Sequence, residues 1–398
     1  MKKIYYGRAV YDKKEINAVL NVLKNDSLSL IDGKKVKTLE KKISQIFGKK
    51  YGLMVNSGSS ANLLALSSFK FKKGSEIITP NLTFSTTVAP IYQLGLIPHF
   101  VGVEKNKFIT NTNQIEKCIN NKTVALMIPN LLGNIADWKT IHKIAKKYNL
   151  KIIEDSADTI GYKVNKINLG KYSDITTNSF YASHIINGAG TGGIVCFNDY
   201  KLYERAKLLR GWGRSSAVFN ESENASKRFN VKVSGIDYDA KYIFSDLGYN
   251  FLPSEISAAF ALEQIKKLKK NILTRNKNFE YLKKFFANYE NYFKLPEQNP
   301  GVKTPWLAFP LVIRKNKKFS RKKMQIFFEK SNIQTRTIFT GNILKQPVMY
   351  KRFYKKHPKS DEVADDVMKN GILLGCHQGM NKKDLDYICS TFKKFIKE

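Results

Sequence analysis

Residues 51–69 read YGLMVNSGSSANLLALSSF and join a short apolar run to a helical pattern through a turn of small residues. The apolar run 51–55 suits a buried strand, and a helix is expected to begin directly behind it at Gly58. Such a helix start offers free backbone NH groups and the positive end of the helix dipole to an anion. Gly58 and Ser59 are therefore candidate phosphate contacts, although an ordinary glycine turn with a serine cap would have the same pattern.

The alternation of strand and helix patterns continues along the chain. Helical patterns occur at 83–95 and 137–149, and apolar runs of strand length lie at 75–80, 97–103, 123–130 and 150–157. This order predicts an α/β fold with a mostly parallel sheet that helices cover on both faces. Because ligands of such sheets bind beyond the carboxyl ends of the strands, the loops at those ends are the expected site.

A long helical pattern over residues 253–289 separates this region from the rest of the chain. Behind it, short apolar runs and helical patterns indicate a smaller α/β unit. We therefore expect two domains. Residues 1–252 would form an N-terminal arm and the large domain, and residues 253–398 would form a linking helix and a small C-terminal α/β domain.

The chain is strongly basic, with 398 residues, a formal net charge of +35 and a pI near 9.8. Lysines are spread in pairs over helix faces, without an arginine-rich arm or a basic strip interleaved with aromatic residues. This pattern favours solvated helix faces and argues against nucleic acid as a partner, while binding of another polyanion is the alternative. No run approaches the roughly 18 apolar residues that a membrane span needs, so no membrane is expected as a partner.

The spacing of the cysteines also limits the classes of protein to which the chain can belong. Cys118, Cys196, Cys376 and Cys389 lie far apart and lack CxxC spacing. This pattern indicates reduced thiols in a cytoplasmic protein and predicts neither a disulfide framework nor a metal site. The opening stretch MKKIYYGRAVYDKKEI has no apolar run behind its basic residues, so we do not interpret it as a signal peptide.

Further stretches carry candidate site residues. In IIEDSADTIG (152–161), Asp155 and Asp158 end a buried strand, where a carboxylate can hold the proton of a cationic nitrogen ring or simply cap a helix. Phe84 follows a strand end and could stack on a flat ring or belong to the core. Asn250 lies in a turn before the long helical pattern, where asparagine is usually structural.

The order of these motifs resembles the DegT/StrS family of sugar aminotransferases over nearly the whole chain. The matching motifs are SGSSAN (57–62), FSTT (84–87), EDSAD (154–158), TGG (191–193), LGYN (247–250) and SAA (257–259). The resemblance implies fold type I, with a mostly parallel sheet of the seven-stranded type in the large domain. It also implies pyridoxal phosphate (PLP) or pyridoxamine phosphate (PMP) as the cofactor, and at least a homodimer.

The resemblance further implies a role for each motif residue. Gly58, Ser59 and Ser179 would bind the cofactor phosphate, Phe84 would stack on the ring, Asp155 would bind the pyridine nitrogen, Asp158 would lie near the ring hydroxyl, and Asn250 would reach a phosphate across the dimer interface. Most relatives have glutamine at the position of Asp158.

The stretch SFYASHIINGAGTGG (179–193) departs from the aminotransferase pattern. In that pattern a serine and four further residues precede the lysine that bonds to the PLP aldehyde, but this chain has His184 there. Its neighbours Ser183 and Ile185 are not lysine either, and the glycine-rich stretch behind is one residue longer than usual. Histidine cannot form that bond, yet it moves protons near neutral pH. A satisfied core histidine is the other interpretation.

The replacement of this lysine by histidine marks one branch of the family, the nucleotide-sugar 3-dehydratases. Resemblance to that branch extends to GWGR (211–214), PWLAFP (305–310) and above all TRTIFTGNILKQP (335–347). It implies removal of the 3-hydroxyl from a nucleotide-linked 4-keto-6-deoxyhexose in O-antigen dideoxysugar biosynthesis, with GDP-4-keto-6-deoxymannose as the expected substrate. His184 would move the protons, and glutamate would restore PMP. Arg336 and Asn342 would contact the substrate, although Arg336 could instead form a surface ion pair.

A related branch acts on CDP-sugars with a 2Fe-2S cluster, whose cysteines lie largely between the GWGR and LGYN motifs. This chain has no cysteine between Cys196 and Cys376, so we expect no iron–sulfur cluster. Three functions therefore stay open at this level. They are a nucleotide-sugar 3-dehydratase, for which a GDP-linked substrate is expected and a CDP-linked one is the alternative, a nucleotide-sugar aminotransferase with altered activity, and a non-catalytic polyanion-binding protein on a borrowed fold.

Overall fold

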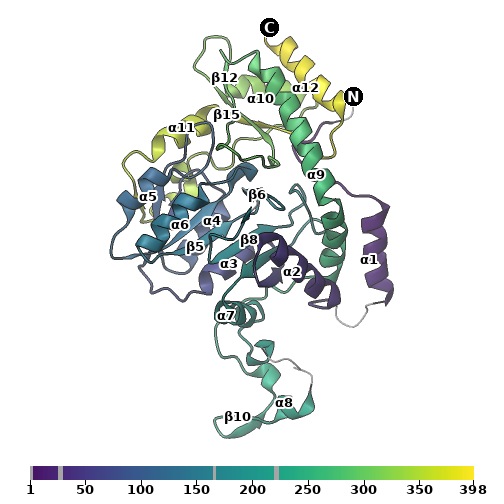
Figure 1. Cartoon of the computed structure of the whole chain (residues 1–398), viewed down its shortest axis with the longest axis vertical. Coiled ribbons are helices and arrows are strands. Elements are labelled where there is room, and N and C mark those ends of the chain that lie inside the picture. The colour runs from purple at the N-terminus through teal and green to yellow at the C-terminus, as the bar shows by residue number, and fades with distance from the viewer. Residues whose placement is uncertain (1–2, 26–29, 165–166, 219–223) are drawn as a thin grey trace.

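A computed structural model describes residues 3–25, 30–164, 167–218 and 224–398. An 8-stranded sheet lies at its centre (Figure 1). In sheet order, its strands are β1 (Tyr51–Val55), β9 (Gly193–Phe197), β8 (Ile175–Ser179), β5 (Lys151–Asp155), β4 (Thr123–Pro129), β2 (Glu76–Pro80), β3 (Ile97–Val101) and β14 (Lys355–Lys356). β9 runs antiparallel to both of its neighbours, and the other neighbouring strands are parallel. The prediction of a mostly parallel sheet is therefore confirmed.

The sheet is wider than expected because β14 adds to its edge. Lys355 and Lys356 pair in parallel with His99 and Phe100 of β3, although β14 lies in the C-terminal part of the chain. The other strands of the sheet all fall within residues 51–197, as the seven-stranded type requires. The C-terminal part is thus joined to the large sheet through the backbone as well as through side chains.

Helices cover both faces of the large sheet. On one face pack α3 (Gly58–Ser67), α4 (Ser85–Gln93) and α7 (Tyr200–Arg210). On the other face pack α2 (Lys34–Phe47), α5 (Thr112–Cys118), α6 (Trp138–Lys147) and the first half of α9 (Glu255–Ala287). These layers bury mainly Val, Ile, Leu and Phe, and each such side chain contributes roughly 1.5–3 kcal/mol when fully buried.

The long helix α9 is the one that the sequence predicts over residues 253–289. On its outer side lies α1 (Lys13–Asn25). Around the second half of α9 lie a 3-stranded antiparallel sheet of β12 (Phe293–Lys294), β13 (Phe309–Ile313) and β15 (Gly371–Leu374), and the helices α10 (Arg321–Lys330), α11 (Asp361–Asn370) and α12 (Lys382–Phe395). The start of the chain also packs here, because Ile4 pairs with Ile333. The division into two domains stays a prediction.

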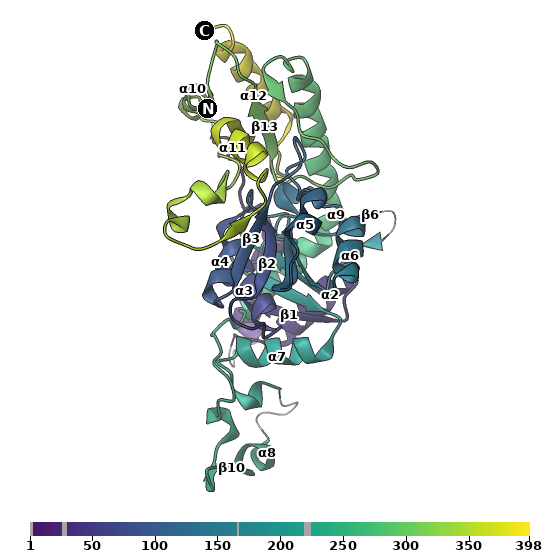
Figure 2. The same cartoon turned by 90° about the vertical axis from the view of Figure 1, so that its left-hand side faces the viewer.

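A projecting arm, formed by residues 211–218 and 224–250, extends away from the body behind α7 (Figures 1 and 2). It contains the short elements η2 (Ser215–Val218), α8 (Ala225–Phe229), β10 (Val231–Val233), β11 (Ile236–Tyr238) and η3 (Ala240–Tyr242). A second small hairpin, β6 (Lys163–Val164) with β7 (Ile167–Asn168), lies on the body.

The expectations about membranes and metals can be compared with the described ranges. Within them, no helix is both long and apolar enough to cross a membrane. All four cysteines are buried as free thiols, Cys118 on α5, Cys196 on β9, Cys389 on α12 and Cys376 just behind β15. In the same part of the chain, no group of three or more His, Cys, Asp or Glu side chains is arranged to hold a metal ion.

Candidate active site

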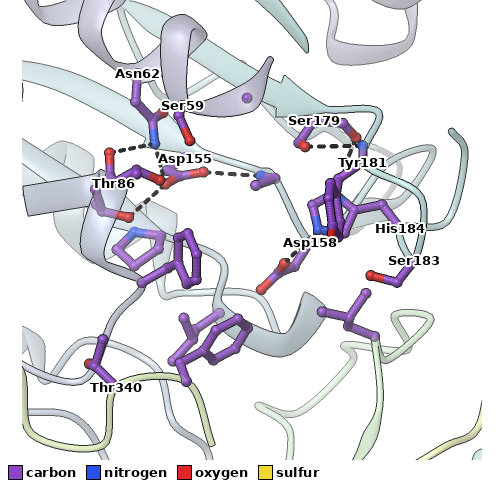
Figure 3. A pocket seen from close by; sticks show the side chains of 18 of the residues that line it. Ser59, Asn62, Thr86, Asp155, Asp158, Ser179, Tyr181, Ser183, His184 and Thr340 are labelled. Carbon is purple, nitrogen blue, oxygen red and sulfur yellow. Dashed lines mark hydrogen bonds and ion pairs between the residues drawn. The ribbon is translucent and has the colours of Figure 1, made fainter. Parts of the chain in front are cut away.

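A cavity of about 680 Å³ opens at the carboxyl ends of β4, β5 and β8, where the sequence predicts the ligand site (Figure 3). One wall consists of these strand ends and the start of α3. The opposite wall comes from Tyr6 and from residues between 336 and 346. The predicted site residues that line the cavity are Gly58, Ser59, Phe84, Asp155, Asp158, Ser179, His184 and Arg336.

The start of α3 forms one end of the cavity and fits a phosphate. Ser57 caps the helix, because its hydroxyl oxygen accepts a hydrogen bond from the NH of Ser60 at 3.0 Å. The NH groups of Gly58 and Ser59 stand at the helix start, where the helix itself supplies no acceptor. A β-carbon on Gly58 would lie 2.5 Å from Cβ of Ser179, so only glycine allows this close approach of strand and helix. The three residues predicted to bind the phosphate therefore lie together.

Asp155, the last residue of β5, presents a buried carboxylate to the cavity, with 5% of its surface exposed. Its Oδ2 accepts hydrogen bonds from Nδ2 of Asn62 and Oγ1 of Thr87, both at 2.8 Å. Its Oδ1 accepts one from the NH of Ala157 at 3.1 Å. Burial raises the pKa of Asp155, and these hydrogen bonds oppose the rise. A cationic ring nitrogen in the cavity would stabilise the ionised carboxylate further, so the residue fits its predicted role.

Phe84 is a wall residue of the cavity and not part of the core. It immediately precedes α4, and 50% of its side chain is exposed. Its ring meets that of Phe339 edge to face, with 6.1 Å between the centroids. A flat ligand ring could therefore stack on its open face.

His184 and Asp158 lie next to each other in the cavity wall, with 3.8 Å between Nε2 and Oδ1 (Figure 3). Nδ1 of His184 lies 3.4 Å from the carbonyl oxygen of Ser179. Because a carbonyl only accepts hydrogen bonds, Nδ1 carries the hydrogen in this contact and Nε2 keeps its lone pair. Oδ2 of Asp158 accepts a hydrogen bond from the NH of Leu132 at 2.8 Å, within the turn η1 (Leu131–Gly133).

The two side chains do not form a charged pair. Burial lowers the pKa of His184 to about 4. Burial, and secondarily the charge of Asp155, raise the pKa of Asp158 to about 7. At any pH at which the histidine is charged, the aspartic acid is therefore protonated. Near neutral pH, the imidazole is uncharged and can accept a proton at Nε2, and Asp158 can hold one beside it.

Among the described residues that line the cavity, none is lysine. The cavity thus contains no amine that could bond to an aldehyde, whichever neighbour of His184 is aligned with the usual lysine. Arg336 lines the cavity and places its guanidinium 5.8 Å from the ring centre of Tyr6. Its Nη1 donates to the carbonyl of Thr335 at 2.8 Å, and the described residues form no ion pair with it.

The structure corrects the role expected for Asn342. Its side chain is fully buried and does not line the cavity. Its amide donates to Asp361 at 3.0 Å and Asp365 at 2.8 Å, and its oxygen caps η4 (Ile343–Lys345) at the NH of Leu344. With donors and acceptor all used inside the fold, Asn342 holds the turn and does not reach a substrate.

Asn250 also lies outside the cavity of its own chain. It is exposed at the base of the projecting arm, where it pairs with Gly211. Its predicted contact is with a phosphate bound in a second subunit. This role of Asn250 stays a prediction.

Sequence reasoning assigned no role to most residues of the far wall, although it singled out Arg336 and the stretch 335–347. Tyr6 lines the cavity because Ile4 bonds to the backbone of Asn332 and Gln334, a pairing between the start of the chain and its C-terminal part. No local pattern around Tyr6 marks it as a site residue. The other missed lining residues include Asn62, Thr87, Tyr181, Phe339, Thr340 and Gln346. All six lie within stretches that the sequence analysis singled out, but none of them was assigned a role there.

Comparison with known proteins agrees with this geometry. The sequence model of the DegT/DnrJ/EryC1/StrS aminotransferase family matches residues 10–393. The chain is 32% identical over 396 residues to the GDP-4-keto-6-deoxy-D-mannose 3-dehydratase of Yersinia pseudotuberculosis. The matched region covers 97% of each of the two chains. The structure of the E. coli GDP-4-keto-6-deoxy-D-mannose-3-dehydratase with bound hydrated PLP has a TM-score of 0.86 and 30% identity, covering 98% of this chain and 99% of that one.

A second solved structure of such a dehydratase is similar to the same extent. It contains a trapped PLP–glutamate geminal diamine and gives a TM-score of 0.85 at 29% identity, covering 97% of this chain and 99% of that one.

Replacing Asp158 with asparagine should stabilise the cofactor-free protein at about pH 8 and hardly change its stability at about pH 4. Because the pKa of Asp158 is raised to about 7, the folded chain keeps a proton that the unfolded chain releases near its ordinary pKa. Folding therefore loses stability as the pH rises from about 4 to 7, by up to about 4 kcal/mol, and asparagine removes this loss. Urea unfolding at both pH values measures the difference, and an equal effect at both would contradict the shift.

Proposed function

We propose that this chain, which belongs to the DegT/DnrJ/EryC1/StrS aminotransferase family, is a nucleotide-sugar 3-dehydratase. The observation that carries the proposal is His184. Its imidazole faces a cavity in which the described lining residues offer a phosphate site, a ring-nitrogen partner and a stacking surface but no lysine. An enzyme that only transfers amino groups needs an amine at this place, whereas a dehydratase needs a group that moves protons.

The cofactor is PLP, which alternates with PMP. When bound as PMP, it supplies an amine that condenses with a keto group and a ring that accepts electrons from the neighbouring carbon. Gly58, Ser59 and Ser179 would bind its phosphate, and Phe84 would stack on its ring. The carboxylate of Asp155 would hold the proton of the ring nitrogen in place.

His184 would serve in two successive roles. Nε2 of the uncharged imidazole would take a proton from the carbon next to the cofactor amine. The imidazolium would then donate this proton to the hydroxyl on carbon 3 of the sugar, so that it could leave as water. Burial holds the pKa of His184 at about 4, which keeps the free histidine ready as a base and makes its charged form a strong acid. Asp158, 3.8 Å away, is placed to share the proton between the two steps.

The proposed substrate is GDP-4-keto-6-deoxymannose, supported by the similarity to dehydratases that act on this sugar. One water would release the sugar together with the amino group and leave PLP, and a second water would convert this sugar to the 3,6-dideoxy-4-keto sugar and ammonia. Glutamate is the proposed donor that converts PLP back to PMP, forming 2-oxoglutarate. The similar structure with a trapped PLP–glutamate geminal diamine supports this choice. Arg336, which has no ion-pair partner among the described residues, is proposed to contact an anionic part of a substrate.

We also propose that the protein is a homodimer in which the projecting arm packs on a second copy. The arm exposes apolar side chains that a monomer would leave in water. Among them, Leu247 is 93% exposed, Ile236 is 67% exposed and Phe229 is 57% exposed. Asn250 lies at the base of the same arm, where a partner subunit could meet it.

Replacing His184 with asparagine should lower the rate of sugar dehydration by about 10²–10⁴-fold while PLP stays bound, because general acid–base catalysis contributes that much. The measurements are release of ammonia from GDP-4-keto-6-deoxymannose and PLP absorbance before and after addition of glutamate. Asp137→Asn, at the half-buried N-cap of α6 and outside the cavity, serves as the control. The proposal would be wrong if the unchanged protein accumulated an amino sugar, or if the asparagine variant released ammonia at the normal rate.

Placing aspartate at both Leu247 and Ile236 should convert the dimer to a monomer, because the charges would have to be buried in the interface. Light scattering coupled to size exclusion measures the mass. Leu273→Asp is the matched control, since Leu273 is 61% exposed on α9 and lies outside the arm. A double variant that keeps the mass of the dimer would show that the arm is not the interface.

A further inference from the structure

Arg275 of α9 is a fully buried cation directly behind His184. Its Nη2 donates to the carbonyl of Ser183 at 3.3 Å and to the carbonyl of His184 itself at 3.4 Å. The guanidinium therefore contacts the backbone of the residue that faces the cavity, although Arg275 does not line the cavity.

The remaining donors of Arg275 reach two further segments. Nη1 donates to the carbonyls of Trp306 and Leu307, at 3.3 and 3.0 Å. Nε donates to Oε1 of Gln378 at 2.7 Å. One planar group thus joins the turn of His184 to residues 306–307, which lead into β13, and to the loop that contains Gln378. Lysine could not replace it, because a single ammonium cannot donate in all of these directions.

The environment of this cation is unusual for a purely structural arginine. A buried guanidinium is commonly paired with a carboxylate, which offsets the cost of removing the charge from water. Within the described ranges, Arg275 forms no ion pair and its partners are uncharged. No ion pair with a described residue therefore cancels its positive charge, which also interacts with the carboxyl of Asp158 in the neighbouring site.

The turn that carries His184 has little regular structure of its own. The NH of His184 bonds to the carbonyl of Tyr181 at 3.0 Å, but residues 181–187 form neither helix nor strand. α9 supports this turn from behind, since Asn271 donates to the carbonyl of Ile185 at 3.5 Å. Arg275 is the part of this support that bonds to His184.

We propose that Arg275 is a positioning residue, which holds the backbone of His184 so that the imidazole faces the reacting carbon and, by its charge, favours the uncharged imidazole. This inference rests on the proposed function of His184 as the proton carrier. It adds a residue that acts through His184 without touching substrate or cofactor.

The groups around His184 agree with this role. In front of the ring lies the carboxyl of Asp158, beside it the ring of Tyr181, and at Nδ1 the carbonyl of Ser179. Burial is the main cause of the lowered pKa of His184, and the charge of Arg275 lowers the pKa further. Near Arg275 stand the phenol of Tyr6 and the thiol of Cys376, and both stay protonated because burial raises the pKa of each, that of Cys376 to about 12. Neither of them supplies a negative charge near neutral pH. The carboxyl of Asp158 also interacts with the charge of Arg275, and because its pKa is raised to about 7 it becomes a carboxylate only as the pH rises past neutral.

The experiment compares Arg275→Lys, Arg275→Met and the control Arg210→Lys. Arg210 is also buried, with 3% exposed, but its donors go to Asp32, Glu40 and the carbonyl of Met54, away from the cavity. Three quantities are measured in each variant: PLP affinity, the single-turnover rate with glutamate, and the titration of His184 by NMR in the cofactor-free protein. The His184 signal is assigned by its loss in His184→Asn.

Both Arg275 variants should bind PLP nearly as well as the unchanged protein, because the residues that would bind it lie on other elements. Their single-turnover rate should fall by about 10²-fold, the loss expected from a misplacement of about 1 Å. The titration midpoint of His184 should rise in Arg275→Met, which removes the charge, and stay closer to the original in Arg275→Lys. The Arg210→Lys control should change none of these quantities by more than a few fold.

Unchanged rates and an unchanged His184 midpoint in both Arg275 variants would overturn the inference. A fall in the single-turnover rate that is fully explained by weaker binding of PLP would also overturn the inference. If the unchanged protein forms 2-oxoglutarate but does not dehydrate the sugar, the proposed function fails, while the His184 titration still tests Arg275 because it needs neither sugar nor cofactor.

Gln378→Glu provides a second route if the Arg275 variants do not fold. The buried Nε2 of Gln378 has no partner among the described residues, so a carboxylate of the same shape leaves no donor unpaired. It would keep the hydrogen bond to Nε of Arg275 and cancel the charge of the guanidinium. The midpoint of His184 should then rise, and an unchanged midpoint would contradict the electrostatic part of the proposal.

Discussion

The site depends on one constraint, the burial of the Asp155 carboxylate at the end of a central strand. A carboxylate in a dry interior is costly unless hydrogen bonds or an opposite charge compensate it. Asn62, Thr87 and the backbone of Ala157 supply hydrogen bonds, but no described residue supplies a positive charge. The cavity in front of Asp155 is therefore suited to a cationic ring nitrogen. The phosphate site proposed at Gly58 and the stacking surface proposed at Phe84 line the same cavity.

Control of protons by burial is the second theme of the structure. The same dry environment moves the pKa of Asp158 up to about 7 and that of His184 down to about 4. These opposite shifts make the pair uncharged over a range of pH and able to pass a proton. Arg275 adds a fixed charge and a fixed geometry from behind. Replacement of a lysine by histidine thus acts together with a surrounding set of residues that suits a proton carrier.

Much of the fold and site could be predicted because the motifs stand at strand ends. Asp155 and Ser179 end neighbouring parallel strands, so the sheet itself brings them to one edge. Asn342 was misassigned because its motif points to a family position, while the direction of its side chain depends on Asp361 and Asp365. Tyr6 could not be found, since a pairing between the start of the chain and residues 332–334 places it in the cavity.

The residue pattern alone was enough to predict the α/β class, the long helix α9 and the family, and to identify the histidine that replaces lysine. These features are local or depend on the order of motifs, which hydrophobic periodicity and residue identity encode directly. Only the folded chain decided which side chains share the cavity, how far burial shifts the pKa of each, and that Arg275 lies behind His184. The physical reason is that burial and electrostatic coupling depend on distances between segments remote in the chain, and no local pattern carries those distances.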